Sequence, residues 1–468
     1  MRPGPLKLLR PRQGDPVQGR GKPSPYYTRG RRSVYGRGWA CPCPAPRRPA
    51  WGRPACLLLL LLAGATIVFY AGRTLQVPSS QAHPAFMASK SASANANAAP
   101  PPYVYYTLKA ASGFVLARAP KGASGQPLSA PRAVAQFGNG FGLAETDSVL
   151  SMQLSPDGRY LAIDGTEDHG EQVWIFDTQH LILNLVPKYV LGNFLHWIPG
   201  TNSHAFLYRP MLPLGSDAPL DGPTWNPGLW VVDAATGMHR NMNIHVPSAY
   251  LVDAVASPDG SHILYSTSAG TAMGSDTWTM SSDGSQIRHL FHITAGAQSI
   301  AGFFTWSPNG KTIAYERLSD SPIPFLPAGL WVMNSNGGLQ RHLAEVDGGH
   351  GFAPAWSPDS RRIAYVARTN IGNRQADLSA QSLQSAIAVV DTRTGHSWIV
   401  AAPAQTGMQI NANPQWSANG ATITFTAFNP INHVIGGTPR YWSASIAADA
   451  SRPSAVPLTP AISHVVGM

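Results

Sequence analysis

Residues 306–338 read WSPNGKTIAYERLSDSPIPFLPAGLWVMNSNGG, and this stretch decides the fold. Pro308 presets the φ angle at the second position of a tight turn, and Asn309-Gly310 supplies residues that tolerate left-handed backbone geometry. The turn leads into an apolar segment, Thr312–Glu316, and a second apolar phrase, Leu330–Asn334, runs into another Gly-rich turn. Short apolar segments bounded by turn residues predict antiparallel strands.

The same phrase recurs along the chain with a period near 50 residues. A Trp or apolar residue precedes Ser-Pro-Asp-Gly or a variant at Leu154–Gly158, Trp197–Gly200, Ala256–Gly260, Trp306–Gly310, Trp356–Ser360 and Trp416–Gly420. The spacings between successive proline positions are 43, 59, 50, 50 and 60, with Ala418 in place of the last proline. Each copy holds two turn-linked strand pairs, which predicts a four-stranded antiparallel blade. The period and the nearly continuous apolar strands therefore predict an all-β fold, a β-propeller.

These phrases resemble the WD-repeat-like propeller blades of the TolB family, which also occur in the propellers of prolyl oligopeptidase relatives. The resemblance covers residues 103–468. Its Trp-Ser-Pro-Asp-Gly, Leu-Trp-Val-Met-Asn and Asp-Gly-Gly pattern is specific to the architecture and not to a function. The resemblance implies a propeller, and TolB-like propellers usually have six blades.

The number of blades follows from the two ends of the repeat region. Six repeats begin at about residues 147, 191, 250, 299, 351 and 411. Three expected strands precede them, Tyr103–Leu108, Gly113–Arg118 and Ala133–Phe137, and a lone strand, Ala461–Gly467, follows them. Pairing both ends in one composite blade closes the ring and leaves no edge strand. This closure favours seven blades, with six as the alternative.

The net charge of +10 is concentrated at the N-terminus. Residues 1–54 carry 13 Lys/Arg and one acid, whereas residues 103–468 carry 19 Lys/Arg and 23 acids. A nucleic-acid-binding fold carries its basic residues on the folded part, so we expect no nucleic acid at the propeller. All three cysteines, Cys41, Cys43 and Cys56, precede the propeller, which therefore has no disulfide.

An uncharged segment, Pro54–Gly72, follows the basic tail. As a helix it would span about 28 Å, close to the hydrocarbon thickness of a bilayer. The positive-inside rule then predicts a disordered cytoplasmic tail (1–53), a single-pass transmembrane signal-anchor (54–72), a flexible linker (73–102) and an extracytoplasmic propeller (103–468), periplasmic or at the cell surface. The alternative is a signal peptide cleaved near Ala82 or Ala85, and in both cases the propeller is exported.

One face of the ring is expected to carry the functional loops. In such a blade, the connection between strands two and three emerges on the same face as the connection between blades. The insertions fall in the former, at Arg209–Pro227, Arg317–Ala328, Ala367–Ser385 and Ala427–Arg440. Because long loops on a rigid scaffold usually build binding sites, we expect ligand contacts on this face. The candidates are Trp225, Asn226, Phe325, His350, Arg374, Asn411, Asn413 and His433. Each would equally suit an ordinary loop or a blade-to-blade hydrogen bond, so their shared location is the stronger argument.

A group of carboxylates lies in the first complete repeat, at Asp164, Glu167, Asp168 and Glu171. Four carboxylates are enough to bind Ca²⁺. They lack a recognised ligand spacing, however, and such acids commonly form a solvated loop. Ca²⁺ at this loop stays an alternative, and no other cofactor is expected.

The sequence contains no Gly-x-Ser-x-Gly elbow, no His-Glu-x-x-His and no phosphate-binding loop. We therefore expect a monomeric binding scaffold, and not an enzyme, with an envelope protein or a cell-wall polymer as its partner. Two alternatives stay open. One is a funnel-type glycan hydrolase or lyase with converging carboxylates, and the other is a transmembrane sensor whose basic tail engages a cytoplasmic partner.

Overall fold

The computed structural model describes residues 103–109, 113–121, 128–137, 148–167, 170–187, 190–200, 204–210, 228–244, 250–269, 273–294, 296, 298–319, 321, 323–347, 352–430, 440–446, 455–457 and 464–466. The expected tail, transmembrane segment and linker, residues 1–102, lie outside this part of the chain. Within it, no helix is long and apolar enough to cross a membrane.

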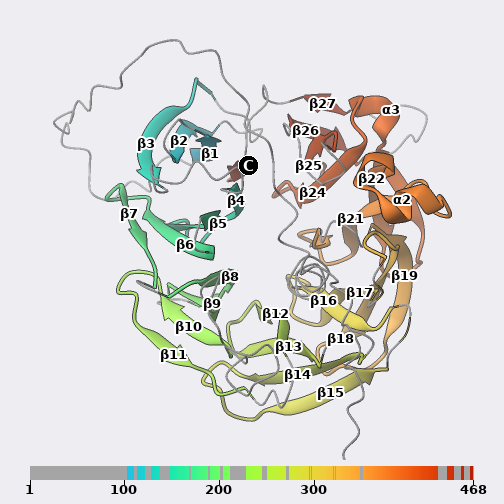
Figure 1. Cartoon of the computed structure of the whole chain (residues 1–468), viewed down its shortest axis with the longest axis horizontal. Coiled ribbons are helices and arrows are strands. Elements are labelled where there is room, and N and C mark those ends of the chain that lie inside the picture. The colour runs from blue at the N-terminus through green and yellow to red at the C-terminus, as the bar shows by residue number, and fades with distance from the viewer. Residues whose placement is uncertain are drawn as a thin grey trace, which may run out of the picture. The chain divides into compact units, whose positions relative to one another are not determined.

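The described residues form seven four-stranded antiparallel sheets, which follow one another around a ring (Figure 1). Given from the first strand to the fourth, blade 1 is β28 (His464–Val466), β1 (Tyr103–Lys109), β2 (Phe114–Pro120) and β3 (Arg132–Phe137). Blade 2 is β4 (Ser148–Leu154), β5 (Tyr160–Glu167), β6 (Gly170–Asp177) and β7 (Ile182–Leu185). Blade 3 is β8 (Gly192–Trp197), β9 (Ala205–Pro210), β10 (Trp230–Asp233) and β11 (His239–Asn241). Blade 4 is β12 (Tyr250–Ala256), β13 (His262–Ser268), β14 (Ser275–Ser281) and β15 (Arg288–Ile293).

Blade 5 is β16 (Ile300–Trp306), β17 (Thr312–Leu318), β18 (Ala328–Asn334) and β19 (Arg341–Val346). Blade 6 is β20 (Ala355–Trp356), β21 (Arg362–Arg368), β22 (Ser385–Asp391) and β23 (Ser397–Ala401). Blade 7 is β24 (Ile410–Trp416), β25 (Thr422–Phe428), β26 (Arg440–Ser445) and β27 (Val456–Pro457). Three short helices accompany blades 6 and 7: α2 (Arg374–Leu378), η2 (Ala380–Ser382) and α3 (Pro403–Thr406).

Blade 1 is built from both ends of the repeat region. Residues 105–107 of β1 pair antiparallel with residues 464–466 of β28. Tyr441 of blade 7 joins Val104 and Tyr106 of blade 1 in one buried cluster. On the other side, the ring centroid of Phe137 lies 5.2 Å from that of Trp174 in blade 2. The prediction of seven blades closed by a composite blade is therefore confirmed, and the six-bladed alternative is wrong.

The Ser-Pro-Asp-Gly turns are held by their own side chains. Ser155 Oγ donates to Asp157 Oδ1 (2.6 Å) and accepts from the backbone N–H of Tyr160 (2.9 Å), the first residue of β5. The same two bonds recur at Ser257, Ser307, Ser357 and Ser417. Each turn therefore satisfies the polar groups at the start of a strand, which is why the phrase marks the blades so regularly.

The tryptophan before the turn links neighbouring blades. Its indole Nε1 donates to a carbonyl of the preceding blade in three places: Trp197 to Gln153 (3.1 Å), Trp356 to Thr305 (3.1 Å) and Trp416 to Ala355 (2.9 Å). In each case the acceptor stands directly before the first residue of the preceding blade's own phrase. These bonds fix the distance between blades on the face that carries the tight turns.

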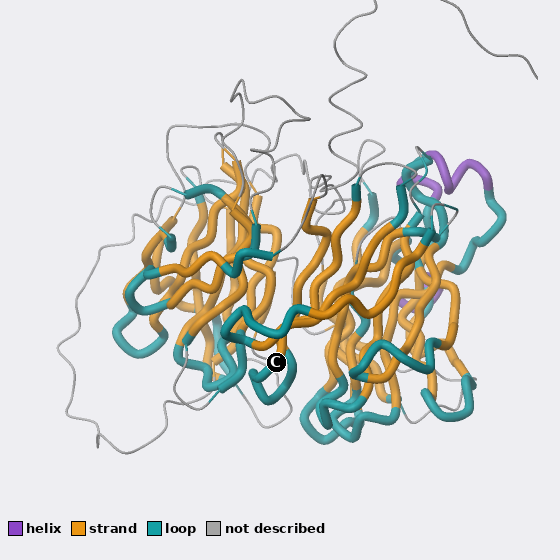
Figure 2. The backbone as a smooth tube through the Cα atoms, turned by 90° about the horizontal axis from the view of Figure 1, so that it is seen from below, coloured by secondary structure: helices purple, strands orange, loops and turns teal. Residues whose placement is uncertain are grey.

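The two faces of the ring differ as expected. The helical insertion with α2 stands at one edge of the sheets, and tight turns occupy the opposite edge (Figure 2). We call the first face the loop face and the second the turn face. Antiparallel pairing places the connections between strands two and three on one face and the other two connections within each blade on the opposite face, because neighbouring strands run in opposite directions.

We predict that removing residues 458–468 lowers the thermal midpoint of unfolding by at least about 5 °C, because β1 then becomes an open edge strand. Differential scanning calorimetry measures the shift. Replacing His464, Val465 and Val466 by alanines keeps the main-chain pairing with β1 and should lower the midpoint less. Equal midpoints for the truncated and the full chain would contradict the closure.

Candidate functional site

Four of the eight residues proposed as ligand contacts lie in the described part of the chain. Phe325 lies in the β17–β18 connection, Arg374 begins α2, and Asn411 and Asn413 lie in β24. The other four, Trp225, Asn226, His350 and His433, lie outside the described residues.

Phe325 and Arg374 belong to two insertions that are bound to each other. Arg368, the last residue of β21, has a fully buried side chain and pairs with Asp377 of α2 at 3.0 Å. Its Nη1 also donates to the carbonyl of Phe325 (2.6 Å), whose own N–H donates to the carbonyl of Asp377 (3.1 Å). One guanidinium therefore joins the insertions of blades 5 and 6.

The rest of the blade 6 insertion is equally well connected. Arg368 Nε donates to Asn370 Oδ1 (2.9 Å), and Asn370 Nδ2 donates to the carbonyl of Ser382 (2.6 Å). Asn373 caps α2 by accepting from two backbone N–H groups. Gln409, just before β24, donates to the carbonyl of Gln381 (2.8 Å). We name residues 323–327 and 369–384, which these bonds link to each other and to the blades, the loop platform.

The two asparagines of β24 have different environments. Asn411 is buried, and its Nδ2 donates to the carbonyl of Ser385 (2.8 Å) while its N–H donates to Ser385 Oγ (3.1 Å). Asn411 therefore joins blade 6 to blade 7, as the alternative reading of these residues allowed. Asn413 is exposed, with φ at 54°, and its Nδ2 donates to Thr426 Oγ1 (3.4 Å). Only Asn413 of this pair presents a side chain at the surface.

Two of the four acids proposed for Ca²⁺ are buried together between blades 2 and 3. Asp164 in β5 and Glu171 in β6 are 4% and 5% exposed. Of the other two, Asp168 lies outside the described residues, and the structure describes only the backbone of Glu167. Among the described residues, no group of three His, Cys, Asp or Glu side chains is arranged to hold a metal ion.

The Asp164–Glu171 pair occupies positions that carry serines in blade 4. In blade 2, Asp164 comes directly after Ile163, the residue that pairs with Trp174. In blade 4, Ser266 comes directly after Tyr265, which pairs with Trp278 in the same way. Glu171 and Ser275 each stand three residues before those tryptophans. In blade 4, Ser266 Oγ donates to the carbonyl of Ala301 (2.7 Å) and Ser275 Oγ to that of Ser299 (2.8 Å), both in blade 5. Blade 2 thus places two carboxyls where blade 4 makes inter-blade hydrogen bonds.

Burial raises the pKa of both carboxyls, and the charge of Glu171 raises the pKa of Asp164 further. The positive charge of Arg209 opposes both shifts without cancelling them. Arg209 itself donates to Asn193 Oδ1 (2.8 Å) and to the carbonyl of Leu251 (3.4 Å), and so spans blades 3 and 4. These buried polar groups lie between blades 2 and 3, and the pKa of each of the two carboxyls is raised above its ordinary value.

The structure also contains a pocket on the turn face, opposite the face proposed from the sequence. Its volume is about 570 Å³, and it lies between blades 4 and 5. Trp306, Arg288, His262, Asp259, Asn309 and Asn336 are among its lining residues. Sequence reasoning placed the expected ligand contacts on the opposite face and did not single out this tryptophan as one of them.

Sequence reasoning also missed Arg368, because it singled out the exposed Arg374 of the same insertion. A signal was present in the sequence. Arg209, Arg317 and Arg368 each stand at or next to the start of an insertion, at the end of a strand that is otherwise mostly apolar. A cation in such a place needs partners from the loop that follows.

We predict that Arg368→Ala lowers the free energy of unfolding by about 3 kcal/mol, because Asp377 and the carbonyl of Phe325 lose a buried charged donor. Arg374→Ala, at an exposed position of the same insertion, should change it by less than about 0.5 kcal/mol. Urea unfolding of both variants measures the difference. Equal stability of the two variants would contradict the role given to Arg368.

We predict that the free energy of unfolding of Asp164→Asn rises relative to that of the wild type as the pH increases above the ordinary carboxyl pKa of 3.8. The folded chain holds the Asp164 proton to higher pH than the unfolded chain, so the wild type loses stability as pH rises through the raised pKa. The asparagine does not ionise and lacks this loss. Urea unfolding between about pH 4 and pH 8 measures it.

Asp259→Asn provides the control, since asparagine occupies the matching turn position at Asn309. Hydrogen bonds from Ser257 and Ser261 lower the pKa of Asp259 to about 2. The contribution of this carboxylate to folding stability is therefore complete above the ordinary carboxyl pKa and is lost only at lower pH. The stability difference for this variant should stay constant over the same pH range. A constant difference for Asp164→Asn as well would show that its carboxyl is fully ionised when folded.

No protein-family model matches the chain, and no relative was found among the curated proteins. Solved structures do match. TolB from Acinetobacter baumannii is 17% identical over 63% of this chain and 62% of its own, with a TM-score of 0.40. The match thus spans less than two thirds of that relative.

Two further structures cover more of their own length. An oligogalacturonate lyase from Vibrio parahaemolyticus is 12% identical over 75% of this chain and 88% of its own, with a TM-score of 0.51. A hypothetical selenium-binding protein from Sulfolobus tokodaii is 12% identical over 79% and 93%, with a TM-score of 0.50. At such identities the likeness concerns the fold alone. The chain is a seven-bladed β-propeller, and its resemblance to TolB-like propellers is confirmed as a resemblance of fold.

Proposed function

We propose that the chain is a binding propeller whose loop platform docks a protein partner outside the cytoplasm. The observation that carries this proposal is the exposure of aliphatic side chains on insertions that are bonded to each other. Ile371, Leu378 and Ile323 are 56%, 51% and 38% exposed, and all three belong to the loop platform.

These side chains are held close to the bonds that fix the platform. Ile323 stands two residues before Phe325 and Leu378 directly follows Asp377, the two residues whose backbones are hydrogen-bonded at 3.1 Å. Ile371 follows Asn370, which is bound to Arg368. A buried ion pair that keeps exposed aliphatic groups in one arrangement reduces the entropy lost on binding.

The composition of the platform favours a protein over a polysaccharide as partner. Isoleucine and leucine provide apolar area that a protein surface can cover, and exposed apolar groups of this kind favour a docking site. Arg374 is exposed in the same insertion, so the matching surface should place an acidic group beside an apolar patch.

The location of the partner follows from the proposed membrane topology. With residues 1–53 in the cytoplasm and 54–72 as anchor, the propeller faces the envelope or the cell exterior, and so would its partner. A glycan-cleaving funnel requires carboxyls that converge where a glycan can reach them. The Asp164–Glu171 pair does not favour that function, because both side chains are buried between blades.

We predict that the double variant Ile371→Asp/Leu378→Asp retains at least tenfold less partner than the wild type, because both substitutions place charge on the docking surface. The measurement is affinity capture of envelope proteins on the full-length chain, with quantification by mass spectrometry.

Met238→Asp is the matched control, since Met238 is 74% exposed and follows the β10–β11 turn on the opposite face. It should retain the same partner within about twofold, as expected of a surface substitution outside an interface. Equal retention by the platform variant and the control would contradict the proposal. Retention of a protease-resistant cell-wall polymer in place of a protein would replace the proposed partner class.

A further inference from the structure

Among the residues that the structure describes, blades 4 and 5 lack two hydrogen bonds that join other neighbouring blades. The first concerns Trp306, which stands where Trp197, Trp356 and Trp416 donate to the preceding blade. By that pattern its acceptor would be the carbonyl of Val255. Within the described part of the chain, however, the buried Nε1 of Trp306 has no hydrogen-bond partner. Its indole therefore lacks the hydrogen bond that would tie it to the described residues of blade 4.

The second missing bond concerns Arg288. It lies opposite Thr279 in blade 4, as Arg240 lies opposite Val231 in blade 3 and Arg341 opposite Val332 in blade 5. Arg240 donates to the carbonyls of Ser282 and Asp283 in the next blade, and Arg341 donates to the carbonyl of Thr392. The guanidinium of Arg288 has no hydrogen bond or ion pair to any residue that the structure describes.

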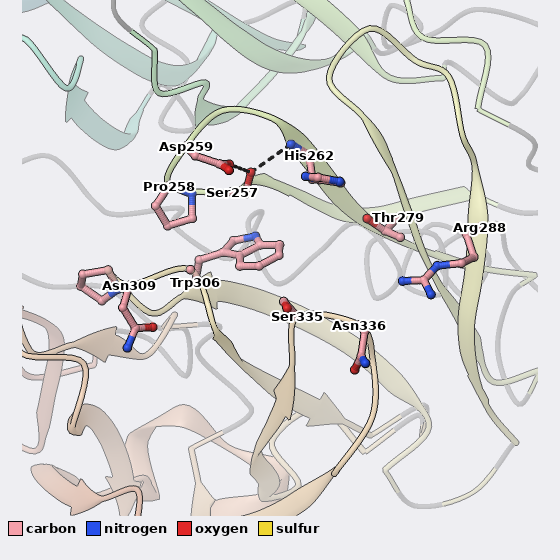
Figure 3. Close-up of a pocket in the computed structure, with 12 residues that line it drawn as sticks. Ser257, Pro258, Asp259, His262, Thr279, Arg288, Trp306, Asn309, Ser335 and Asn336 are labelled. Carbon is pink, nitrogen blue, oxygen red and sulfur yellow. Dashed lines mark hydrogen bonds between the residues drawn. The ribbon is translucent and has the colours of Figure 1, made fainter.

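The turn-face pocket lies where these two bonds are missing. Figure 3 shows the Trp306 indole between the blade 4 turn, with Ser257 and Asp259, and the blade 5 turn, with Ser335 and Asn336. Arg288 stands at one side of the same space. Its volume of about 570 Å³ falls within the range of small-molecule sites.

We propose that this pocket binds a sugar unit that carries a carboxylate, a hexuronic acid. The free guanidinium of Arg288 pairs with the carboxylate through two parallel hydrogen bonds. The Trp306 indole offers an apolar surface to the C–H face of the pyranose ring. The amides of Asn309 and Asn336 supply donors and acceptors for hydroxyl groups.

The charges of the pocket favour a carboxylate over a phosphate. Asp259 lines the pocket as a carboxylate, since hydrogen bonds from Ser257 and Ser261 keep its pKa low. A pocket lined by one guanidinium and one carboxylate suits a ligand with a single negative charge better than a dianion. The bound sugar would bridge blades 4 and 5 in place of the two missing bonds, and this site is separate from the loop platform.

The test measures binding of glucuronic acid to the full-length chain by saturation-transfer NMR, with glucose and acetate as separate probes. Glucuronic acid should bind with a Kd at least tenfold below that of either probe. Arg288→Gln should raise its Kd at least tenfold, to the level of glucose. Arg341→Gln, at the matching position of blade 5, should leave it within twofold.

Arg288 is exposed, so its variant should keep the fold, and an unchanged melting temperature verifies this. Trp306→Leu should weaken glucose and glucuronic acid alike, whereas Ile371→Asp should weaken neither. Glucuronic acid binding no tighter than acetate would reduce the pocket to an anion site and overturn the proposal. Unchanged binding by Arg288→Gln would overturn it as well.

Discussion

The structure depends on the closure of the ring by β28 and β1. Seven sheets, each packed against two neighbours, leave no exposed first strand only if the last segment of the repeat region returns to the first. The three paired residues of β28 are few, but they join positions more than 350 residues apart in sequence. Such a contact limits the freedom of every blade between them, and so fixes the frame on which the insertions are mounted.

Within that frame, a small set of hydrogen bonds is repeated from blade to blade, and the departures from it are informative. Tryptophan and arginine side chains join neighbouring blades on the turn face, and serines do so nearer the loop face. Blade 2 has Asp164 and Glu171 in place of two such serines, and burial raises the pKa of both carboxyls. Between blades 4 and 5, neither the tryptophan nor the arginine makes this bond to a described residue, and a pocket lies there. At the loop platform, Arg368 adds bonds between two insertions.

Much of the fold could be predicted from the sequence. The repeat starts expected at about 147, 191, 250, 299, 351 and 411 agree with first strands that begin at 148, 192, 250, 300, 355 and 410. Turn chemistry is local, because Pro, Asp and Gly act within four residues, so it can be recognised without tertiary structure. The site could be predicted less well, because it depends on contacts between blades. Asn411 proved to be buried against Ser385, and Phe325 serves Arg368 through its backbone, which no sequence pattern indicates. That Arg288 has no partner among the described residues depends on the neighbouring blade and not on its own repeat.

The central claim, that the loop platform docks a protein, is tested most directly by hydrogen exchange on the full-length chain with and without its captured partner. Exchange reports the free energy of local opening for each segment. The account predicts slower exchange at residues 323–327 and 369–384 on binding, with the turns of the opposite face unchanged. Protection confined to the turn face, or to residues 1–53, would contradict it.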